Sequence, residues 1–135
     1  MSRRLLTLVG LIVVLAFPSM NAWAAVRAKA SKTVTKTVVG TTVICKKWGP
    51  IQVKLKVAQT IVKGKVKIRI LAVSEPIWPQ HTVKSVFINT RALPLLEQEV
   101  LQLQGANLET ISGATDVSVS FKSSLQAALI AAAKV

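Results

Sequence analysis

The sequence predicts an α+β fold, an antiparallel sheet of three to four strands with two helices packed on one face. Two patterns predict it. Apolar and polar residues alternate with period two through the middle of the chain, which is typical of strands with one buried face. Nearer the C-terminus, apolar residues recur every three or four positions, which is typical of helices. The length of 135 residues fits one domain.

The first 24 residues have the order of a secretory signal peptide. A basic pair is followed by the apolar run 5–17 and by an A-x-A pattern at 22–24. A helix over that run would be about 20 Å long, short of the roughly 30 Å hydrocarbon core of a bilayer. We therefore expect cleavage after Ala24 and an extracytoplasmic location, secreted or associated with the cell envelope. The alternative is that the segment is kept as a membrane anchor.

The positive charge is concentrated in the first half of the mature chain. The protein has 18 Lys and Arg against 5 Asp and Glu, a formal net charge of +13. Every charged residue between Arg27 and Arg69 is a Lys or Arg. We expect residues 25–32 to be a flexible basic leader and residues 33–135 to be the folded domain.

The composition excludes several kinds of chemistry. One Cys and one His cannot form a disulfide framework or a zinc module, and we expect no metal site. The few acids are scattered, and His81 lies in a Pro-rich loop, so neither a paired-carboxylate hydrolase nor a Ser-His-Asp enzyme is indicated. Function must then come from backbone groups, hydroxyls or a cofactor.

The strands are expected in the first half of the domain. Residues 51–57 and 65–70 alternate apolar with polar or basic side chains, and Lys63-Gly64 between them is suited to a tight hairpin turn. Residues 33–47, rich in Val and Thr, predict a third strand or a pair of strands. Trp48-Gly49-Pro50 forms the turn into the next strand.

The helices are expected in the second half. Residues 94–103 carry apolar side chains on one face, and Gly105 is a stop signal. An earlier start, capped by Asn89, would put Pro94 inside the helix and kink it. A second helix is predicted from about Asp116 to Lys134.

Lysines of the predicted hairpin form a basic strand face. Such a face is either an ordinary solvated surface or a binding surface for the phosphates of wall polymers or lipids. No aromatic residue alternates with these lysines, so base stacking, and hence a nucleic-acid partner, is not expected. Trp48 and Trp78 flank the sheet at its turns, as caps of the core or as a wall for a flat ligand.

Residues 109–115, directly before the last helix, are the strongest candidate binding site. Ser112, Gly113, Ala114 and Thr115 combine small side chains, hydroxyls and a flexible backbone at a helix N-terminus. Free backbone N–H groups and the helix dipole favour an anion there. The segment is therefore either a phosphate site or an ordinary helix cap.

The chain resembles the FMN-binding domain family, in particular its short secreted bacterial members. This family also includes the flavin-carrying subunits of sodium-pumping NADH:quinone reductases and similar electron-transport complexes. The resemblance covers roughly residues 33–133. It rests on Ser112-Gly113-Ala114-Thr115 with Ser118, on the aromatic-Gly-Pro turn 48–50, and on two segments of the middle and last parts of the chain, 88–101 and 106–108.

The resemblance implies FMN as the cofactor. The phosphate would lie at Ser112, Gly113, Ala114, Thr115 and Ser118, and Trp48, Leu93 and Pro94 would be candidates for the wall of the flavin ring. In covalent members, the last Thr of the signature carries FMN through a phosphoester installed by a flavin transferase. That Thr matches Thr115, and the acidic residue used by the transferase matches Glu109, where the family usually has Asp.

The resemblance further implies an exported, membrane-associated electron carrier with redox partners in the membrane or envelope. No side chains suited to a substrate are evident, so an electron-transfer domain is expected rather than a complete enzyme. Asp116 would bring a carboxylate close to the phosphate unless it points away. The alternatives are a basic envelope-binding module, for anionic wall polymer or lipid, and a related fold that has lost its flavin.

Overall fold

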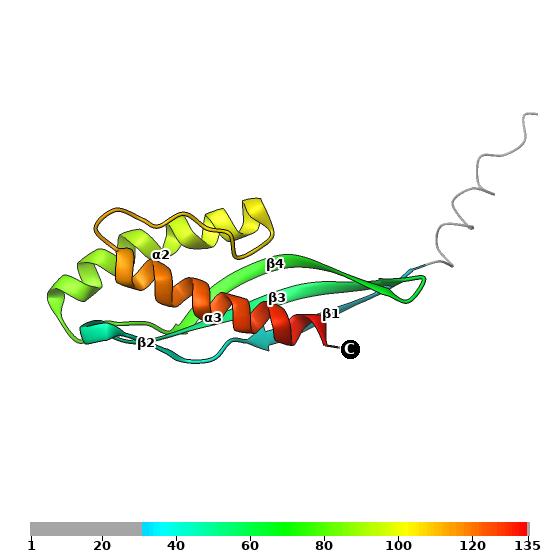
Figure 1. Cartoon of the computed structure of the whole chain (residues 1–135), viewed down its shortest axis with the longest axis horizontal. Coiled ribbons are helices and arrows are strands. Elements are labelled where there is room, and N and C mark those ends of the chain that lie inside the picture. The colour runs from blue at the N-terminus through cyan, green and yellow to red at the C-terminus, as the bar shows by residue number, and fades with distance from the viewer. Residues whose placement is uncertain (1–30, 135) are drawn as a thin grey trace, which may run out of the picture.

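The structure, a computed structural model, describes residues 31–134 and confirms the α+β class (Figure 1). The predicted signal peptide and nearly all of the leader lie outside the described residues. No helix in the described part of the chain is long and apolar enough to cross a membrane. The elements are β1 (Lys32–Val39), β2 (Val43–Cys45), the short 3-10 helix η1 (Lys46–Trp48), β3 (Gly49–Val62), β4 (Lys65–Ile77), α2 (Val83–Leu103) and α3 (Thr115–Ala133).

The long strand β3 is the centre of an antiparallel sheet. β4 pairs along one side of it, and β1 and β2 follow one another along the other side. The segment expected as one strand or two is therefore a pair of strands. The β3–β4 turn lies at Lys63 and Gly64, as predicted, with φ of 50° and 76°. Two positive φ values in succession are typical of the tight turn that matches the twist of a hairpin.

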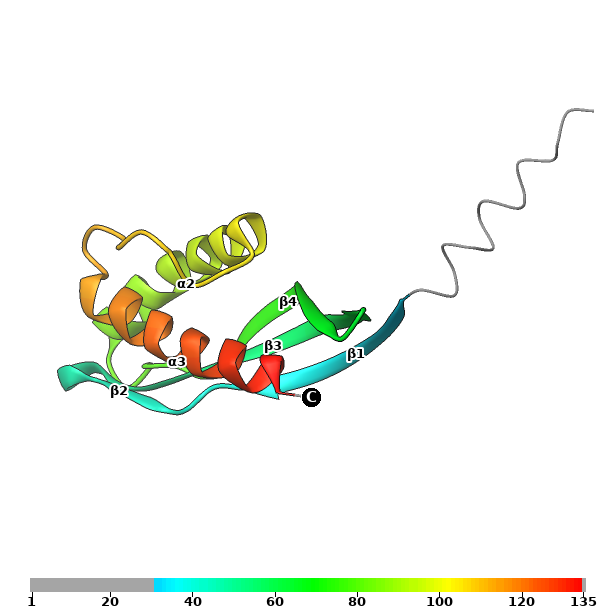
Figure 2. The same ribbon diagram turned by 45° about the vertical axis from the view of Figure 1, so that its right-hand side comes forward.

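Both helices pack on the same face of the sheet. The alternating apolar residues of β3 from Ile51 to Val57 are fully buried there, and Phe121 and Leu125 of α3 belong to the same core. Leu96 and Val100 bring α2 into this core, and α2 lies over β4. Figure 2 shows α3 running along the sheet, with α2 beside it. The apolar face of the sheet and the apolar faces of the two helices are buried against each other. This burial is the main source of stability in a fold of two layers.

Helix α2 begins at Val83, so its predicted start at Pro94 is wrong. Thr82 forms a capping box with Ser85, in which each residue's side chain accepts a hydrogen bond from the other residue's backbone N–H. Pro94 lies inside the helix, on its exposed face. Water can reach the carbonyl that loses its partner there, which lowers the cost of an internal proline. The last helix begins at Thr115, one residue before the predicted position.

The sheet extends beyond the helical layer. The side chain of Gln59 reaches the carbonyl of Ala132 at the end of α3, and the side chain of Gln104, after α2, pairs with the backbone of Ile70. Past these contacts the β3–β4 hairpin and the beginning of β1 project from the body (Figures 1 and 2). We call residues 32–34 and 60–69 the sheet tip.

Candidate functional site

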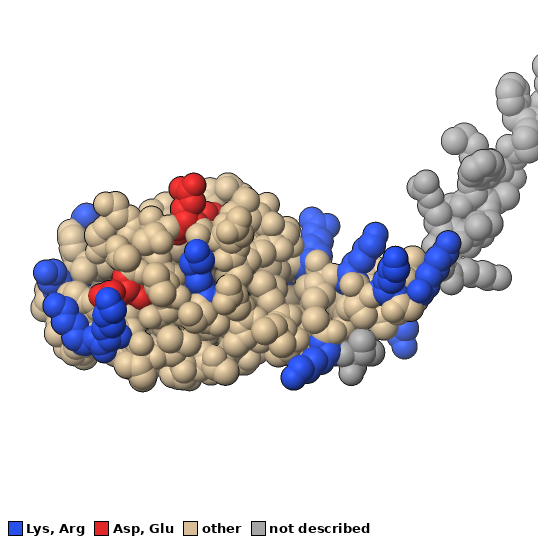
Figure 3. Space-filling view, in the orientation of Figure 1, with Lys and Arg blue, Asp and Glu red and all other residues tan. Residues whose placement is uncertain are grey.

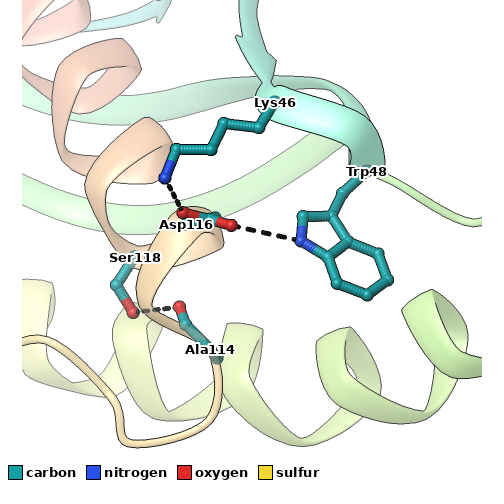
Figure 4. Close-up of polar contacts among 5 residues, drawn as sticks. All are labelled: Lys46, Trp48, Ala114, Asp116 and Ser118. Carbon is teal, nitrogen blue, oxygen red and sulfur yellow. Dashed lines mark hydrogen bonds and ion pairs between the residues drawn. The ribbon is translucent and has the colours of Figure 1, made fainter.

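The loop before α3 is a tight turn that is held by hydrogen bonds to the side chain of Ser118. The N–H of Ala114 donates to the carbonyl of Ile111 (3.0 Å), and Gly113 at the third position has a φ of 80°. This is the geometry of a type II turn, which favours glycine at that position. The buried hydroxyl of Ser118 accepts from the N–H of Ile111 (3.1 Å) and donates to the carbonyl of Ala114 (2.9 Å; Figure 4). The turn is thus held in one conformation against the helix.

The N-terminus of α3 has no side-chain cap. Ala114 stands at the cap position, and the first intrahelical bond runs from the N–H of Ser118 to the carbonyl of Ala114 (2.9 Å). The amides of Thr115, Asp116 and Val117 precede that bond and have no acceptor within the helix. These donors, together with the helix dipole, make the end of α3 attractive to an anion.

The carboxylate of Asp116 is engaged by η1. It pairs with the ammonium of Lys46 (2.8 Å) and accepts a hydrogen bond from Nε1 of Trp48 (3.3 Å; Figure 4). The hydrogen bond from Lys46 is the main reason why the pKa of Asp116 lies below its ordinary value. The negative charge close to the helix end is therefore matched by a lysine, and the indole of Trp48 is oriented by the same carboxylate.

A cavity of about 230 Å³ opens where η1, α2 and the start of α3 meet. Asn89 of α2 lies in its wall and is only 1% exposed. Its Nδ2 donates to the carbonyl of Pro79 (2.7 Å), but its Oδ1 has no partner among the described residues. A buried acceptor without a donor is costly, which points to a bound molecule or water as its partner. The cavity is lined by Trp48, Ser85, Ile88, Asn89, Gly113, Ala114, Thr115, Asp116 and Val117.

A second hollow of about 220 Å³ adjoins the same turn. It shares Ile88, Gly113 and Ala114 with the first and adds Ser112 and Arg91. The guanidinium of Arg91 lies 4.0 Å from the ring centre of Phe87, a cation–π contact.

The predicted site residues divide into three groups. Trp48, Gly113, Ala114 and Thr115 line the first cavity, with Thr115 exposed, and Ser112 lines the second. Ser118 lies beneath the turn and supports it. The other residues lie outside both hollows: Leu93 is in the core, Pro94 is exposed on α2, and Glu109 lines a separate hollow, where its N–H donates to Glu99 (2.8 Å).

The contribution of the first half of α2 to the site was not predicted from the sequence. Ser85, Asn89 and Arg91 were not among the predicted site residues, because that helix was expected to begin at Pro94. A signal was present. Ser85 and Asn89 continue the apolar stripe of Leu93, Leu96 and Val100 towards the N-terminus at helical spacing. Polar residues in a stripe that is otherwise buried are candidates for a binding site.

The arrangement fits a phosphorylated ligand with a flat ring. Open amides and the nearby Arg91 suit a phosphate, Asn89 Oδ1 suits a hydroxyl or ring N–H, and the indole of Trp48 suits a planar face. No three His, Cys, Asp or Glu side chains gather within residues 31–134 to hold a metal ion.

No protein-family model matches the chain, and no curated protein matches it.

Proposed function

We propose that this protein is an exported FMN-binding protein that carries electrons in the cell envelope. One observation carries the proposal: the uncapped N-terminus of α3 opens onto a cavity lined by Trp48 and by Asn89, whose buried Oδ1 has no partner among the described residues. A ligand with both an anionic end and hydrogen-bond donors satisfies both features.

The phosphate of FMN is proposed to bind at the Ser112–Thr115 turn. Gly113 removes the side chain that would cover the backbone, and the amides that begin α3 are donors without helical partners. Arg91 and the hydroxyl of Ser112 border the second hollow beside the same turn and can neutralise and bind the phosphate. Lys46 balances the charge of Asp116, so that the carboxylate opposes phosphate binding less strongly.

The remainder of FMN is proposed to occupy the first cavity. The indole of Trp48 offers a flat apolar face, held by its hydrogen bond to Asp116. Asn89 Oδ1 can accept a hydrogen bond from a ribityl hydroxyl or from the N–H of the ring. The side chain of Asn89 is held in place by Pro79, so the acceptor is already oriented before a ligand arrives.

When bound, FMN supplies one- and two-electron transfer, and the protein positions it. The side chains around the two hollows bind and orient; none is arranged as an acid-base pair for a substrate. We therefore propose a carrier that passes electrons between membrane or envelope partners, rather than a complete enzyme.

Thr115 is the proposed site of esterification to FMN by a flavin transferase. It is exposed at the mouth of the cavity, and its hydroxyl makes no hydrogen bond with other described residues. The hydroxyl of Ser118, in contrast, is buried and already bonded twice within the turn. Glu109 is exposed and accessible to the transferase, as its proposed role requires.

The test is to purify the protein from its native envelope and record its absorbance, its intact mass and its N-terminal residue. FMN binding predicts a yellow protein, and export predicts an N-terminus at Ala25. If the protein is colourless, it should be titrated with FMN while the fluorescence of the flavin is followed. A colourless protein that leaves flavin fluorescence unchanged throughout that titration would overturn the proposal.

A further inference from the structure

The face of the sheet that points away from the helices carries five cations. In β3, the odd-numbered positions from Ile51 to Val57 are buried under the helices, so Lys54 and Lys56 lie on the opposite face. The register of β4 places three more cations on that same face, because Ala58 pairs with Arg69, Thr60 with Lys67 and Val62 with Lys65. All five are exposed. We call Lys54, Lys56, Lys65, Lys67 and Arg69 the basic face.

No acid neutralises the basic face. Four of the five acids lie on the helical side of the molecule: Glu75 faces Glu97 of α2, Glu99 is on α2, and Glu109 is in the following loop. Asp116 is paired with Lys46. In Figure 3, Lys and Arg side chains line the projecting end of the sheet without acidic side chains among them, whereas on the helical body both blue and red side chains appear. The projecting end is therefore purely basic on this view.

The sheet tip is apolar on its other face. Val34, Ile61 and Val66 lie there, and Val34 is 46% exposed, whereas their neighbour Ile68 packs against the edge of the core. At about 3.3 Å per residue, the hairpin extends roughly 13 Å past Gln59. The tip is thus a twisted ribbon with cations on one face and aliphatic side chains on the other.

We propose that the basic face docks on an anionic lipid bilayer. Five cations spread over two adjacent strands form a flat array, which suits a plane of lipid phosphates better than a single polymer chain in a groove. The long side chains of these lysines can reach the lipid phosphates while the backbone of the sheet stays above them. None of the strands β1, β3 and β4 contains an aromatic residue, which speaks against stacking on nucleic-acid bases.

Membrane docking here is independent of flavin binding. The basic face lies on the side of the sheet opposite the helices, and the cavity around Asn89 lies on the helical side, at the other end of the sheet from the tip. The two proposals can therefore fail separately. If both hold, docking by the basic face leaves the cavity, on the helical side, directed away from the bilayer.

The first experiment maps lysine reactivity on the full chain. The protein is mixed with vesicles of phosphatidylcholine alone or of phosphatidylcholine with phosphatidylglycerol, treated briefly with an acetylating reagent, and analysed by mass spectrometry. We expect several-fold slower acetylation of Lys54, Lys56, Lys65 and Lys67 on the anionic vesicles only. Lys84 and Lys134, which are exposed on the helical side, are internal controls and should react at unchanged rates. Equal protection of all these lysines, or of none, overturns the proposal.

The second experiment measures binding to the anionic vesicles by sedimentation. Each cation near such a surface contributes about a fivefold gain in affinity, so K65Q/K67Q should lower the binding to anionic vesicles about 25-fold. The matched control K84Q/K134Q removes the same charge from the helical side and should change binding less than twofold. If the two variants lost binding to anionic vesicles equally, binding would depend only on net charge, and the proposal of a docking face would be wrong.

A soluble anionic polymer distinguishes docking on a bilayer from binding to an anionic polymer. If polyglycerol phosphate protects the lysines of the basic face and anionic vesicles do not, the partner is an anionic polymer and the bilayer proposal is wrong. Protection by the vesicles that disappears as salt is raised supports it, because screening weakens contacts between exposed charges.

Discussion

Gly40, between β1 and β2, lies directly against the backbone of Ser124 in the middle of α3. A Cβ at Gly40 would lie 2.0 Å from the carbonyl oxygen of Ser124. The hydroxyl of Ser124 accepts from the N–H of Val53 (2.9 Å) and donates to the carbonyl of Thr41 (2.7 Å). The sheet edge opens at this point, and α3 fills the opening. This contact docks the helix whose N-terminus forms the candidate site.

Gly40→Ala is expected to destabilise the protein by about 3 kcal/mol, because overpacking against a helix backbone forces α3 away from the sheet. The measurement is the free energy of unfolding in urea. Gly105→Ala is the matched control, since its nearest contact would be 3.9 Å away, and it should change stability by less than about 1 kcal/mol. Equal stabilities of the two variants would show that α3 does not depend on this close approach.

Gly113→Ala is expected to abolish retention of flavin. The φ of 80° is strained for alanine by about 1–2 kcal/mol, and the turn that presents the backbone amides would relax into another conformation. Flavin retained after gel filtration is the measurement.

Gly64→Ala provides the matched control. Gly64 has a similar φ of 76°, and a Cβ would meet nothing within 4 Å at either glycine. It lies in the β3–β4 turn, away from the proposed site, so this variant should lose similar stability and keep its flavin. If the two variants retained flavin equally, the phosphate of FMN would have to bind at a place other than the turn at Gly113.

Thr115→Ala should eliminate the covalent adduct. Co-expression of the wild-type protein with a flavin transferase should add one FMN minus water to the intact mass. Ser112→Ala should keep the adduct, and so should Ser118→Ala, although the latter loses the hydroxyl that fastens the turn and should cost about 1 kcal/mol of stability. An adduct that persists in Thr115→Ala would place the phosphoester on another hydroxyl.

Asn89→Leu should weaken FMN binding about tenfold, the scale of one lost hydrogen bond. The dissociation constant comes from titration with free FMN, and the free energy of unfolding is measured without flavin. The variant also loses the bond to Pro79, so stability must be recorded alongside affinity. Unchanged affinity in a folded variant would mean that Oδ1 contacts water rather than flavin.

Glu75→Gln should stabilise the protein at alkaline pH. Burial, with the neighbouring Glu97, raises the pKa of Glu75 from 4.5 to about 9. The folded state therefore holds a proton that the unfolded state releases, so this contribution to stability is complete below pH 4.5 and is lost as pH rises towards 9. Gln imitates the protonated form and should gain about 1–2 kcal/mol at pH 9. Thermal unfolding of the wild type and of Glu75→Gln at pH 5 and pH 9 measures this gain in stability. A wild-type protein that is equally stable at both pH values would contradict the raised pKa of Glu75.

Local patterns were sufficient to predict the sheet. Alternation over 51–57 and 65–70 marks which side chains are buried, and Lys63-Gly64 can adopt two positive φ values in succession. These signals lie within a few residues of one another, and the tertiary structure uses them unchanged. The sequence left open whether residues 33–47 form one strand or two. The break between β1 and β2 lies where Ser124 of α3 bonds to Thr41 and Val53, and Ser124 is distant in the sequence.

The site was only partly predictable. The small residues before α3 indicated an open helix N-terminus, a local property. The cavity also needs Asn89 and Ser85, which the expected helix boundary at Pro94 excluded. A capping box at Thr82 and burial of the stripe through Asn89 outweigh one unfavourable proline on the exposed face.

The sequence by itself determined the fold class, the hairpin, the last helix and the position of the basic residues, since each follows from side chains close together in the chain. Only the tertiary structure decided what surrounds the end of α3. It brings Lys46 and Trp48 onto Asp116, turns Asn89 into a cavity wall, and leaves the sheet tip beyond the helices. These contacts join residues far apart in sequence, and they form because burying two apolar faces together is favourable only in one docking of helices on sheet.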